Sequence, residues 1–159
     1  MPKSFVTGLD QQTQEQMCEV LNANLAMGID LRLAVKQAHW NLRGRGFIGV
    51  HELLDDVSAR LGDGVDMMAE RVAMMGGFAR GTTQVVADKS PLPAYPVELT
   101  DIEEHISELV SRFEAFGKSI REGMDAADEA GDEDTADLLT EVSRAVEKDT
   151  WFIGANAAI

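Results

Sequence analysis

Apolar residues recur at every third or fourth position along four long segments of this chain, which is the spacing of one face of an α-helix. The pattern is strongest between residues 47 and 75, where the stripe consists of Leu54, Val57, Leu61, Val65, Met68, Val72 and Met75. The other segments cover residues 13–40, the stretch that begins near Thr100, and the stretch from Asp132 to about residue 153. Thr100 and Glu103 have the spacing of a capping box at a helix start. A chain of 159 residues has the length of one domain, so an all-α protein with four long helices is predicted.

The connections between these segments predict how the helices are arranged. Residues 43–46 read RGRG, a short turn, and Gly76-Gly77 ends the second helix. Residues 77–98 form a much longer connection that contains three prolines and one possible short helix near residues 83–88. A helix of about 28 residues is roughly 42 Å long, and a linker of roughly 22 residues spans that distance. The third helix can then run parallel to the second, so we predict one ferritin-like domain over residues 1–159 with a crossover linker at 77–98.

The charge of the chain is strongly negative, with a formal net value of −14. Such a charge repels nucleic acids and anionic membranes unless a local basic patch overrides it, and it attracts cations, although solubility alone also accounts for it. Cys18 is the one cysteine, so no disulfide forms within the chain. The sequence start has no signal-peptide pattern, and no apolar run approaches the ~20 residues that span a bilayer. A cytoplasmic protein without a membrane partner is expected, and association with the nucleoid stays open.

Two of the three histidines flank the RGRG turn, in the stretch QAHWNLRGRGFIGVHELLDD. With His51 at 0° on a wheel of about 100° per residue, Asp55 falls at about 40°, Asp66 at about 60° and Glu70 at about 100°. The apolar stripe lies between about 240° and 320°, so these four side chains share a face that is not the core face. His51 with Asp55, and Asp66 with Glu70, are two i,i+4 pairs, each able to hold one ion from one side. The turn also brings His39, at the end of the first helix, toward His51.

The two pairs lie roughly 22 Å apart along the helix axis, too far to meet within one chain. Two copies packed antiparallel about a two-fold axis, near the small residues Ala59 and Gly62, bring the first pair of one copy to the second pair of the other. Imidazole and carboxylate ligands with open positions suit Fe(II), Mn(II) or Zn(II). A solvated helix face or a plain subunit interface explains the same residues, and the spacing alone leaves these hypotheses open. His105 has no comparable partners and is predicted to be a surface residue.

Three stretches resemble the Dps proteins, the mini-ferritins of the ferritin-like superfamily. They are KQAHWNLRGRGFIGVHELLDD, DMMAERVAMMGG and GDEDTADLLTEVSRAVEKDTWFI, within a likeness that covers residues 13–155. The resemblance implies a four-helix subunit that assembles, with two-fold dimers as the building unit, into a hollow homododecamer. It also implies ferroxidase sites at the two-fold interfaces. The implied metal ligands are His39, His51 and Asp55 from one subunit and Asp66 and Glu70 from its neighbour.

Members of that family oxidise Fe(II), usually with hydrogen peroxide in preference to dioxygen, and store Fe(III) as a mineral inside the cage. The resemblance thus implies a ferroxidase that binds and stores iron and protects the cell and its DNA from oxidative damage. Trp40 matches a family tryptophan near the iron that supplies electrons, and core packing is the other interpretation of this residue. Classical ferritins place a Glu-x-x-His motif within one chain, and no histidine here has a glutamate three residues before it.

Acidic residues surround the turn into the last helix, namely Asp125, Asp128, Glu129, Asp132, Glu133, Asp134 and Asp137. Acids favour a helix N-terminus, and in the resembling family acids of this region line three-fold pores, which attract Fe(II). DNA binding is doubtful, because the stretch MPKSFVTGLD holds one lysine and WFIGANAAI holds no basic residue. Three hypotheses remain. The favoured one is an iron-oxidising storage cage; the others are a stationary-phase nucleoid protein whose main role is direct DNA binding, and a bundle whose histidine face is only a subunit interface.

Overall fold

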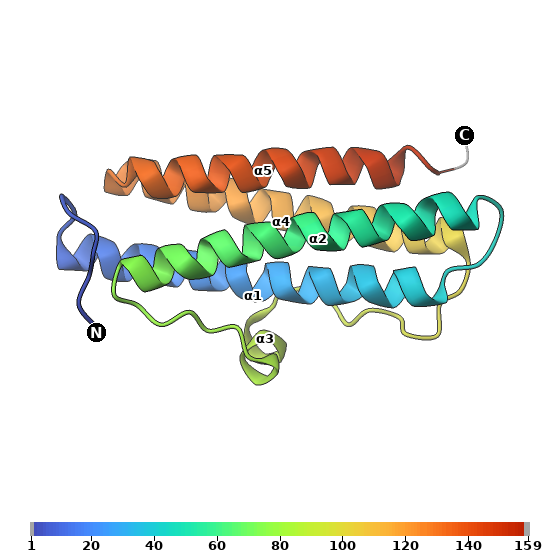
Figure 1. The fold of residues 1–159 in the computed structure, drawn as a ribbon, viewed down its shortest axis with the longest axis horizontal. Coiled ribbons are helices and arrows are strands. Elements are labelled where there is room, and N and C mark those ends of the chain that lie inside the picture. Colours follow the sequence, from blue (N-terminus) through green and yellow to red (C-terminus); the bar gives the residue numbers. More distant parts are fainter. Residues whose placement is uncertain (1, 158–159) are drawn as a thin grey trace.

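A computed structural model of the chain describes residues 2–157, and the remaining ends of the predicted 1–159 domain, residues 1 and 158–159, lie outside the described residues. The helices in Figure 1 are α1 (Gln11–Asn41), α2 (Phe47–Met74), α3 (Thr83–Lys89), α4 (Ile102–Ala130) and α5 (Glu133–Gly154). The described residues contain no strand, so the predicted all-α fold with four long helices and a short extra one is confirmed. Within residues 2–157, no helix combines the length and the apolar character that a membrane crossing requires.

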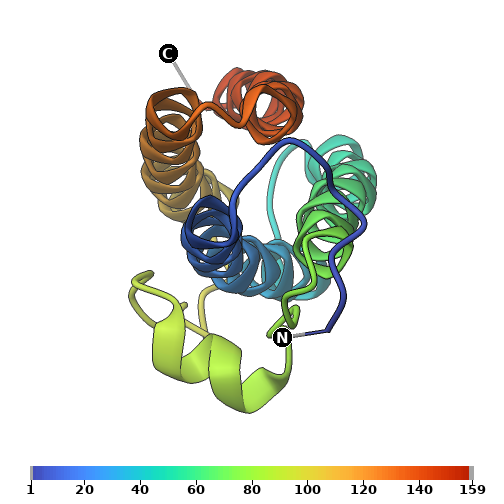
Figure 2. The ribbon, with the colours of Figure 1, turned by 90° about the vertical axis from the view of Figure 1, so that its left-hand side faces the viewer.

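The four long helices lie side by side in an elongated bundle, and α3 lies outside it (Figure 1). Seen end-on in Figure 2, α1 and α5 occupy opposite corners, and each packs against both α2 and α4. Figure 1 shows α2 and α4 running in the same direction. The connection that joins them, which contains α3, returns along the outside of the bundle. On its way this connection packs α3 against α1. The predicted parallel course of the second and third long helices is therefore confirmed.

The apolar stripe predicted from the periodicity forms the core of the bundle. Leu54 and Met68 of α2 are fully buried, and α4 contributes the buried rings of Phe113 and Phe116. Each large apolar side chain that leaves water in this way stabilises the fold by about 1.5–3 kcal/mol. On α1, Leu33 remains 54% exposed. The outer face of α1 thus carries apolar surface that the chain itself does not bury.

The caps at the helix starts explain where the chain changes direction. Gly46 precedes α2 with a φ of +82°, a left-handed conformation that other residues rarely adopt. The carboxylate of Asp101 accepts hydrogen bonds from two N–H groups in the first turn of α4. The capping box predicted at Thr100 is therefore wrong, since Asp101 is the cap. Asp132 caps α5 in the same way.

Two side chains of α4 hold residues 90–101 against the bundle. His105 is 1% exposed; its Nε2 donates to the carbonyl of Leu99 (2.9 Å), and its Nδ1 accepts from the hydroxyl of Tyr95 (2.7 Å). The guanidinium of Arg112 donates to two carbonyls of the crossover and lies 4.8 Å from the centre of the Tyr95 ring. The prediction that His105 is a surface residue is wrong, because this side chain anchors the crossover.

Candidate metal centre

His39 and His51 lie against each other where α1 ends and α2 begins. Their rings stack with centroids 3.7 Å apart and planes 16° from parallel. Nδ1 of His39 is 2.7 Å from the carbonyl oxygen of His51, and Nδ1 of His51 is 2.8 Å from the carbonyl oxygen of His39. The short turn between the two helices therefore brings the histidines together as a reciprocal pair.

The two carbonyl partners decide which nitrogen of each ring is free. A carbonyl oxygen only accepts hydrogen bonds, so both Nδ1 atoms carry the proton and both neutral rings have their lone pair on Nε2. The carbonyl of His39 lies in the last turn of α1, where helix carbonyls have no partner within the helix. A hydrogen bond on the far nitrogen is the usual way in which proteins orient a metal-binding imidazole. The pair thus presents two oriented Nε2 atoms that are suited to bind a metal ion.

Asp55 lies one helical turn after His51, and its side chain is 60% exposed. Its Oδ1 is 3.7 Å from Nε2 of His39, and an ion that bound both atoms at about 2.1 Å would fit this gap. The same Oδ1 accepts a hydrogen bond from Nζ of Lys36 on α1, at 2.5 Å. This hydrogen bond is the main cause that holds the pKa of Asp55 below its ordinary value, with smaller contributions from the neighbouring positive charges. The carboxylate is therefore ionised at neutral pH, and it already forms an ion pair with the ammonium of Lys36.

Asp66 and Glu70 lie further along α2 and are both exposed. Fifteen residues separate Asp66 from His51, which corresponds to roughly 22 Å along the helix. Within residues 2–157, neither carboxylate forms an ion pair. No three His, Cys, Asp or Glu side chains of the described part of the chain gather closely enough to hold a metal ion. One chain thus brings His39 close to His51 and to Asp55, which is not a complete metal site, and it leaves Asp66 and Glu70 apart from them.

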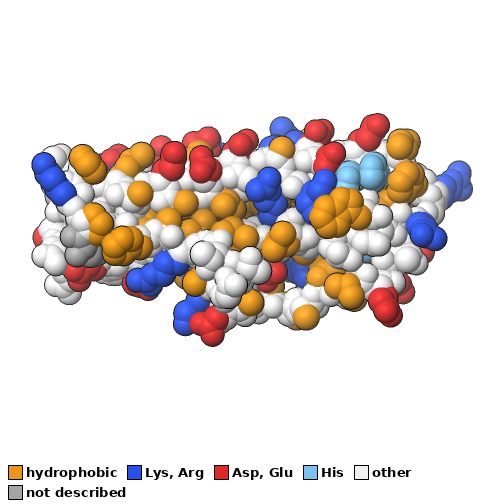
Figure 3. All heavy atoms as spheres, turned by 60° about the horizontal axis from the view of Figure 1, so that its bottom comes forward, with side chains coloured by type: hydrophobic (Ala, Val, Ile, Leu, Met, Phe, Trp, Pro, Cys, Tyr) orange, Lys and Arg blue, Asp and Glu red, His pale blue; other side chains and the backbone are white. Residues whose placement is uncertain are grey.

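Apolar side chains surround the histidine pair on the outer face of the bundle. Trp40 is 66% exposed, Ile48 is 62% exposed, and the ring of Phe47 stacks on that of His51 with centroids 5.0 Å apart. Figure 3 shows histidine atoms at the surface near one end of the molecule, beside hydrophobic side chains and close to Lys and Arg side chains. The interpretation of Trp40 as a core residue is wrong for this chain, because the indole lies outside the core. Leu33, seven residues before Trp40 on α1, is another exposed apolar side chain, and exposed apolar side chains of this kind are often covered at protein interfaces.

The two small residues at the centre of this face, Ala59 and Gly62, have different neighbours in the structure. A Cβ atom added to Gly62 would lie 3.1 Å from Cζ of Arg32, whose Nε donates to the carbonyl of Ser58 (3.0 Å). The close approach at Gly62 is therefore made by an arginine of the same chain. Ala59 is exposed next to it and lines a groove between α1 and α2. Of the two small residues, Ala59 is the one that leaves room for a second copy.

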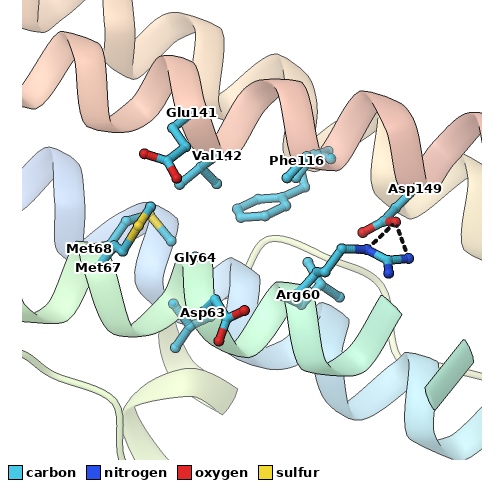
Figure 4. A pocket seen from close by; sticks show the side chains of 13 residues that line it. Arg60, Asp63, Gly64, Met67, Met68, Phe116, Glu141, Val142 and Asp149 are labelled. Carbon is cyan, nitrogen blue, oxygen red and sulfur yellow. Dashed lines mark hydrogen bonds and ion pairs between the residues drawn. The ribbon is translucent and has the colours of Figure 1, made fainter. Parts of the chain in front are cut away.

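A cavity of about 150 Å³ lies inside the bundle between α2 and α5 (Figure 4). Its wall is largely apolar and includes the ring of Phe116; the buried Asp149 accepts a hydrogen bond from the partly exposed Arg60 at 2.9 Å, and the other two acids of the wall, Asp63 and Glu141, are exposed. Burial raises the pKa of Asp149, and the bond from Arg60 opposes that effect. In bundles that bind metals within one chain, inward-pointing glutamates and histidines fill this kind of position. The chemistry of the cavity favours packing, so the histidine pair is the better metal site.

The acidic cluster at the turn into α5 divides into two kinds of residue. Asp132 is 2% exposed and accepts from Nη2 of Arg71 at 2.7 Å, so its carboxylate is held inside the bundle. The other acids of the cluster, Asp125, Asp128, Glu129, Glu133, Asp134 and Asp137, are exposed. Among the seven acids considered as pore residues, Asp132 therefore has a structural role.

Two features of the site were missed in the sequence. Lys36 precedes His39 by three residues, and a helical wheel of the first helix would have placed both on one face. The reciprocal bonds between the histidines join side chains to backbone across a turn, and no spacing rule reports them. Lys36 matters most, because it binds an oxygen that the sequence assigned to the metal.

Known proteins resemble this chain over most of its length. The family model of the ferritin-like domain matches residues 18–158. The DNA protection during starvation protein of Agrobacterium fabrum is 43% identical over 148 residues, which cover 93% of this chain and 91% of that protein. The solved structure of DpsC from Streptomyces coelicolor matches with a TM-score of 0.92 and 31% identity, over 98% of this chain and 91% of that one. Dps from Microbacterium arborescens in the high iron form matches with a TM-score of 0.86 and 32% identity, over 93% and 97%.

Proposed function

Since the chain belongs to the ferritin-like proteins and, within them, to the Dps family, we propose that it is a ferroxidase that oxidises and stores iron. Fe(II) is its substrate and its cargo. The observation that carries the proposal is the reciprocal histidine pair, in which both Nδ1 atoms are bound to carbonyls and Nε2 of His39 lies 3.7 Å from the ionised carboxylate of Asp55. The proposed ligands are His39, His51 and Asp55 from one subunit and Asp66 and Glu70 from a second.

A second subunit is part of the proposal because the two predicted ligand pairs lie too far apart on one helix to bind the same ion. Asp66 and Glu70 are exposed on the same helix as His51, but far from it. An antiparallel copy of α2, centred near the exposed Ala59, would bring these two acids to the histidine pair of the first copy, and the two-fold axis would create two equal sites. The exposed side chains of Leu33, Trp40, Phe47 and Ile48 offer apolar surface that such a contact would bury.

The chemistry suits iron. Mixed imidazole and carboxylate ligands with open positions bind Fe(II), and hard anionic oxygens stabilise Fe(III) more than Fe(II). Two Fe(II) ions would each give one electron to hydrogen peroxide; with two protons, the O–O bond breaks and two waters form without release of a hydroxyl radical. Trp40, exposed beside His39, is placed to give an electron if only one Fe(II) is present. The Microbacterium arborescens protein has been solved in a high iron form, which supports iron as the ion.

We further propose that the product is stored as Fe(III) mineral in the interior of a homododecamer in the cytoplasm. The net charge of −14 on each chain would attract the incoming Fe(II). The exposed acids around the start of α5 are the candidates for the entry pores. Removal of Fe(II) and peroxide together would protect DNA and the rest of the cell from oxidative damage.

Direct DNA binding, the alternative function, has less support from this chain. Residues 2–10 lie across one end of the bundle (Figure 2), where the N–H of Phe5 donates to the carbonyl of Met74 (2.8 Å) and the side chain of Gln14 donates to the carbonyl of Leu9 (2.9 Å). This segment contains Lys3 as its one lysine, whereas phosphate binding requires clustered positive charge. A gel shift with and without Mg²⁺ tests the alternative. Retardation without Mg²⁺ at physiological salt would favour the nucleoid hypothesis.

The proposed function is tested by size exclusion with iron detection, after addition of Fe(II) and then hydrogen peroxide without dioxygen. We expect iron to travel with a particle of about 208 kDa, which is 12 × 17.3 kDa. Asp55→Ala should abolish rapid oxidation. Asp56→Ala is the matched control, because it removes the same side chain at the next residue, where the carboxylate faces Asp149 of α5 closely enough for its charge to raise the pKa of that residue. Equal oxidation rates in the two variants, or iron that elutes apart from the protein, would contradict the proposal.

A further inference from the structure

The cavity between α2 and α5 combines an apolar wall with a polar end (Figure 4). Leu61, Met68, Phe116 and Val146 contribute buried apolar side chains to the wall, and the carboxylate of Asp149 also lines it. The volume is about 150 Å³, and an apolar protein cavity of roughly this size holds benzene. The wall that makes this cavity a poor metal site therefore suits an uncharged organic molecule. It shares no residue with the proposed iron site, so what it binds does not depend on the proposed function.

Small residues and exposed residues together make this space accessible. Gly64 of α2 and Ala145 of α5 both line the cavity, and neither has a side chain long enough to fill it. Asp63 and Glu141 also line it and are exposed, so the cavity reaches the surface between the two helices. A small molecule can thus enter without unfolding of the bundle, and the two exposed carboxylates repel anions.

The polar end of the cavity offers one acceptor and one donor. Asp149 is 1% exposed; its Oδ1 accepts from Nε of Arg60 at 2.9 Å, and its Oδ2 accepts no hydrogen bond from residues 2–157. In the view of Figure 4, this second oxygen lies on the side of Phe116. Nη2 of Arg60 is buried as well. It forms an ion pair with Oδ1 at 2.6 Å, but in the described part of the chain it donates no well-oriented hydrogen bond. Buried polar atoms without partners are costly, and one hydroxyl group can satisfy both, since it donates and accepts.

We propose that this cavity binds a small uncharged arene that carries a hydroxyl group, of which phenol is the simplest. The ring packs against Phe116 and Met68, because aromatic rings and thioethers both make favourable contacts with an arene. The hydroxyl donates to Oδ2 of Asp149 and accepts from Nη2 of Arg60. Since Arg60 already balances the charge of Asp149, a neutral ligand brings no uncompensated charge into the interior.

The test is equilibrium dialysis of phenol, benzene and benzoate, in sealed cells, against the assembled wild-type protein. At neutral pH a phenol hydroxyl, with a pKa of about 10, is protonated. We expect one phenol to bind per chain, with an affinity about two- to tenfold higher than that of benzene, which is the net gain from a hydrogen bond inside a protein. Benzoate should not bind, because it adds an anion to a cavity with three carboxylates and one guanidinium. Equal affinities for phenol and benzene would overturn the polar end, and a lack of saturable phenol binding would overturn the site.

Two variants of the same kind test where the ligand lies. Ala145→Leu fills the cavity and should abolish the binding of phenol and benzene together. Ala115→Leu is the matched control, since Ala115 is exposed on α4 next to Phe116 but does not line the cavity. It should bind phenol like the wild type. If the two variants bind phenol equally well, the ligand lies elsewhere and the proposal falls. Iron oxidation by Ala145→Leu should equal that of the wild type, so failure of either proposal leaves the other standing.

A third variant tests the polar end. Asp149→Asn replaces the anionic acceptor by a neutral amide of the same shape, so its affinity for phenol should fall to within about twofold of its affinity for benzene. Its affinity for benzene should equal that of the wild type, which shows that the cavity is intact in this variant. An unchanged preference for phenol would exclude the carboxylate of Asp149 as the acceptor.

Discussion

Asp132 offers the sharpest test of how the bundle is held together, because one buried carboxylate has two tasks. Its Oδ1 accepts from Nη2 of Arg71 (2.7 Å) and from the N–H of Thr135 (3.1 Å), and its other oxygen accepts from the Thr135 hydroxyl. Asp132 and Arg71 are 2% and 8% exposed. The residue thus caps α5 and forms the shorter ion pair of a largely buried guanidinium.

Two substitutions separate these tasks. Asp132→Asn keeps an oxygen for the helix cap but leaves the buried Arg71 without its anion, and loss of one partner of a buried pair costs about 3–5 kcal/mol. Asp132→Ala also removes the cap, which costs about 1 kcal/mol more. For a chain of this size each kcal/mol lowers Tm by about 2–4 °C. We therefore expect a decrease of about 6–12 °C for Asp132→Asn at the lower end of the range, and a further few degrees for Asp132→Ala.

Thermal unfolding followed by circular dichroism measures both variants, at one protein concentration because assembly couples to stability. Asp134→Asn is the control, since that carboxylate is 85% exposed and 3.8 Å from Nη1 of Arg71, and exposed pairs contribute about 0–1 kcal/mol. A Tm of Asp132→Asn within about 2 °C of the wild type would refute the argument that Arg71 depends on this carboxylate.

Three further predictions concern other parts of the molecule. Burial lowers the pKa of His105 below its ordinary 6.5, while the hydrogen bond to Leu99 and the nearby acids oppose this effect. The contribution of this residue to stability should therefore be complete above pH 6.5 and should decrease as the pH falls below it, because the unfolded chain takes up the proton first. Denaturant unfolding at several pH values should show this slope, and His105→Asn should flatten it. A Cβ at Gly77 would lie 2.6 Å from Sγ of Cys18, so Gly77→Ala should destabilise the fold by about 1–3 kcal/mol, and an unchanged denaturation midpoint would contradict the clash. Ala59→Arg should place a large side chain in the proposed contact between two copies, so the folded variant should elute from a size-exclusion column as a smaller particle than the wild type. An unchanged elution volume would show that Ala59 does not lie in the interface.

The overall fold was predictable because its signals are long and redundant. The stripe that includes Leu54 and Met68 repeats over the whole of α2, and the length of the connection between α2 and α4 is enough to predict a parallel course. Short signals were less reliable. Thr100 and Asp101 are adjacent residues that both make good caps, and only the backbone geometry selects Asp101.

The candidate site was predictable in part for a similar reason. Asp55 follows His51 by one helical turn, and that relation depends only on the helix. The partners of His105 and the position of Lys36 depend on contacts between different elements. Tyr95 reaches His105 from a proline-rich connection, and Lys36 reaches Asp55 across two helices. Spacing within the first helix places Lys36 on the face of His39, but it does not tell which side chain of another element Lys36 meets.

The reciprocal pair also has a consequence for the turn that joins α1 to α2. Each histidine ring is held by the backbone of the other histidine, so the donor atoms are in place only while the two helices keep their present register. One residue inserted between Leu42 and Gly46 would change no ligand, yet it would lengthen the non-helical turn and change how the start of α2 meets the end of α1 unless the turn absorbed it. The length of this loop therefore specifies the geometry of the metal centre as much as the two imidazoles do.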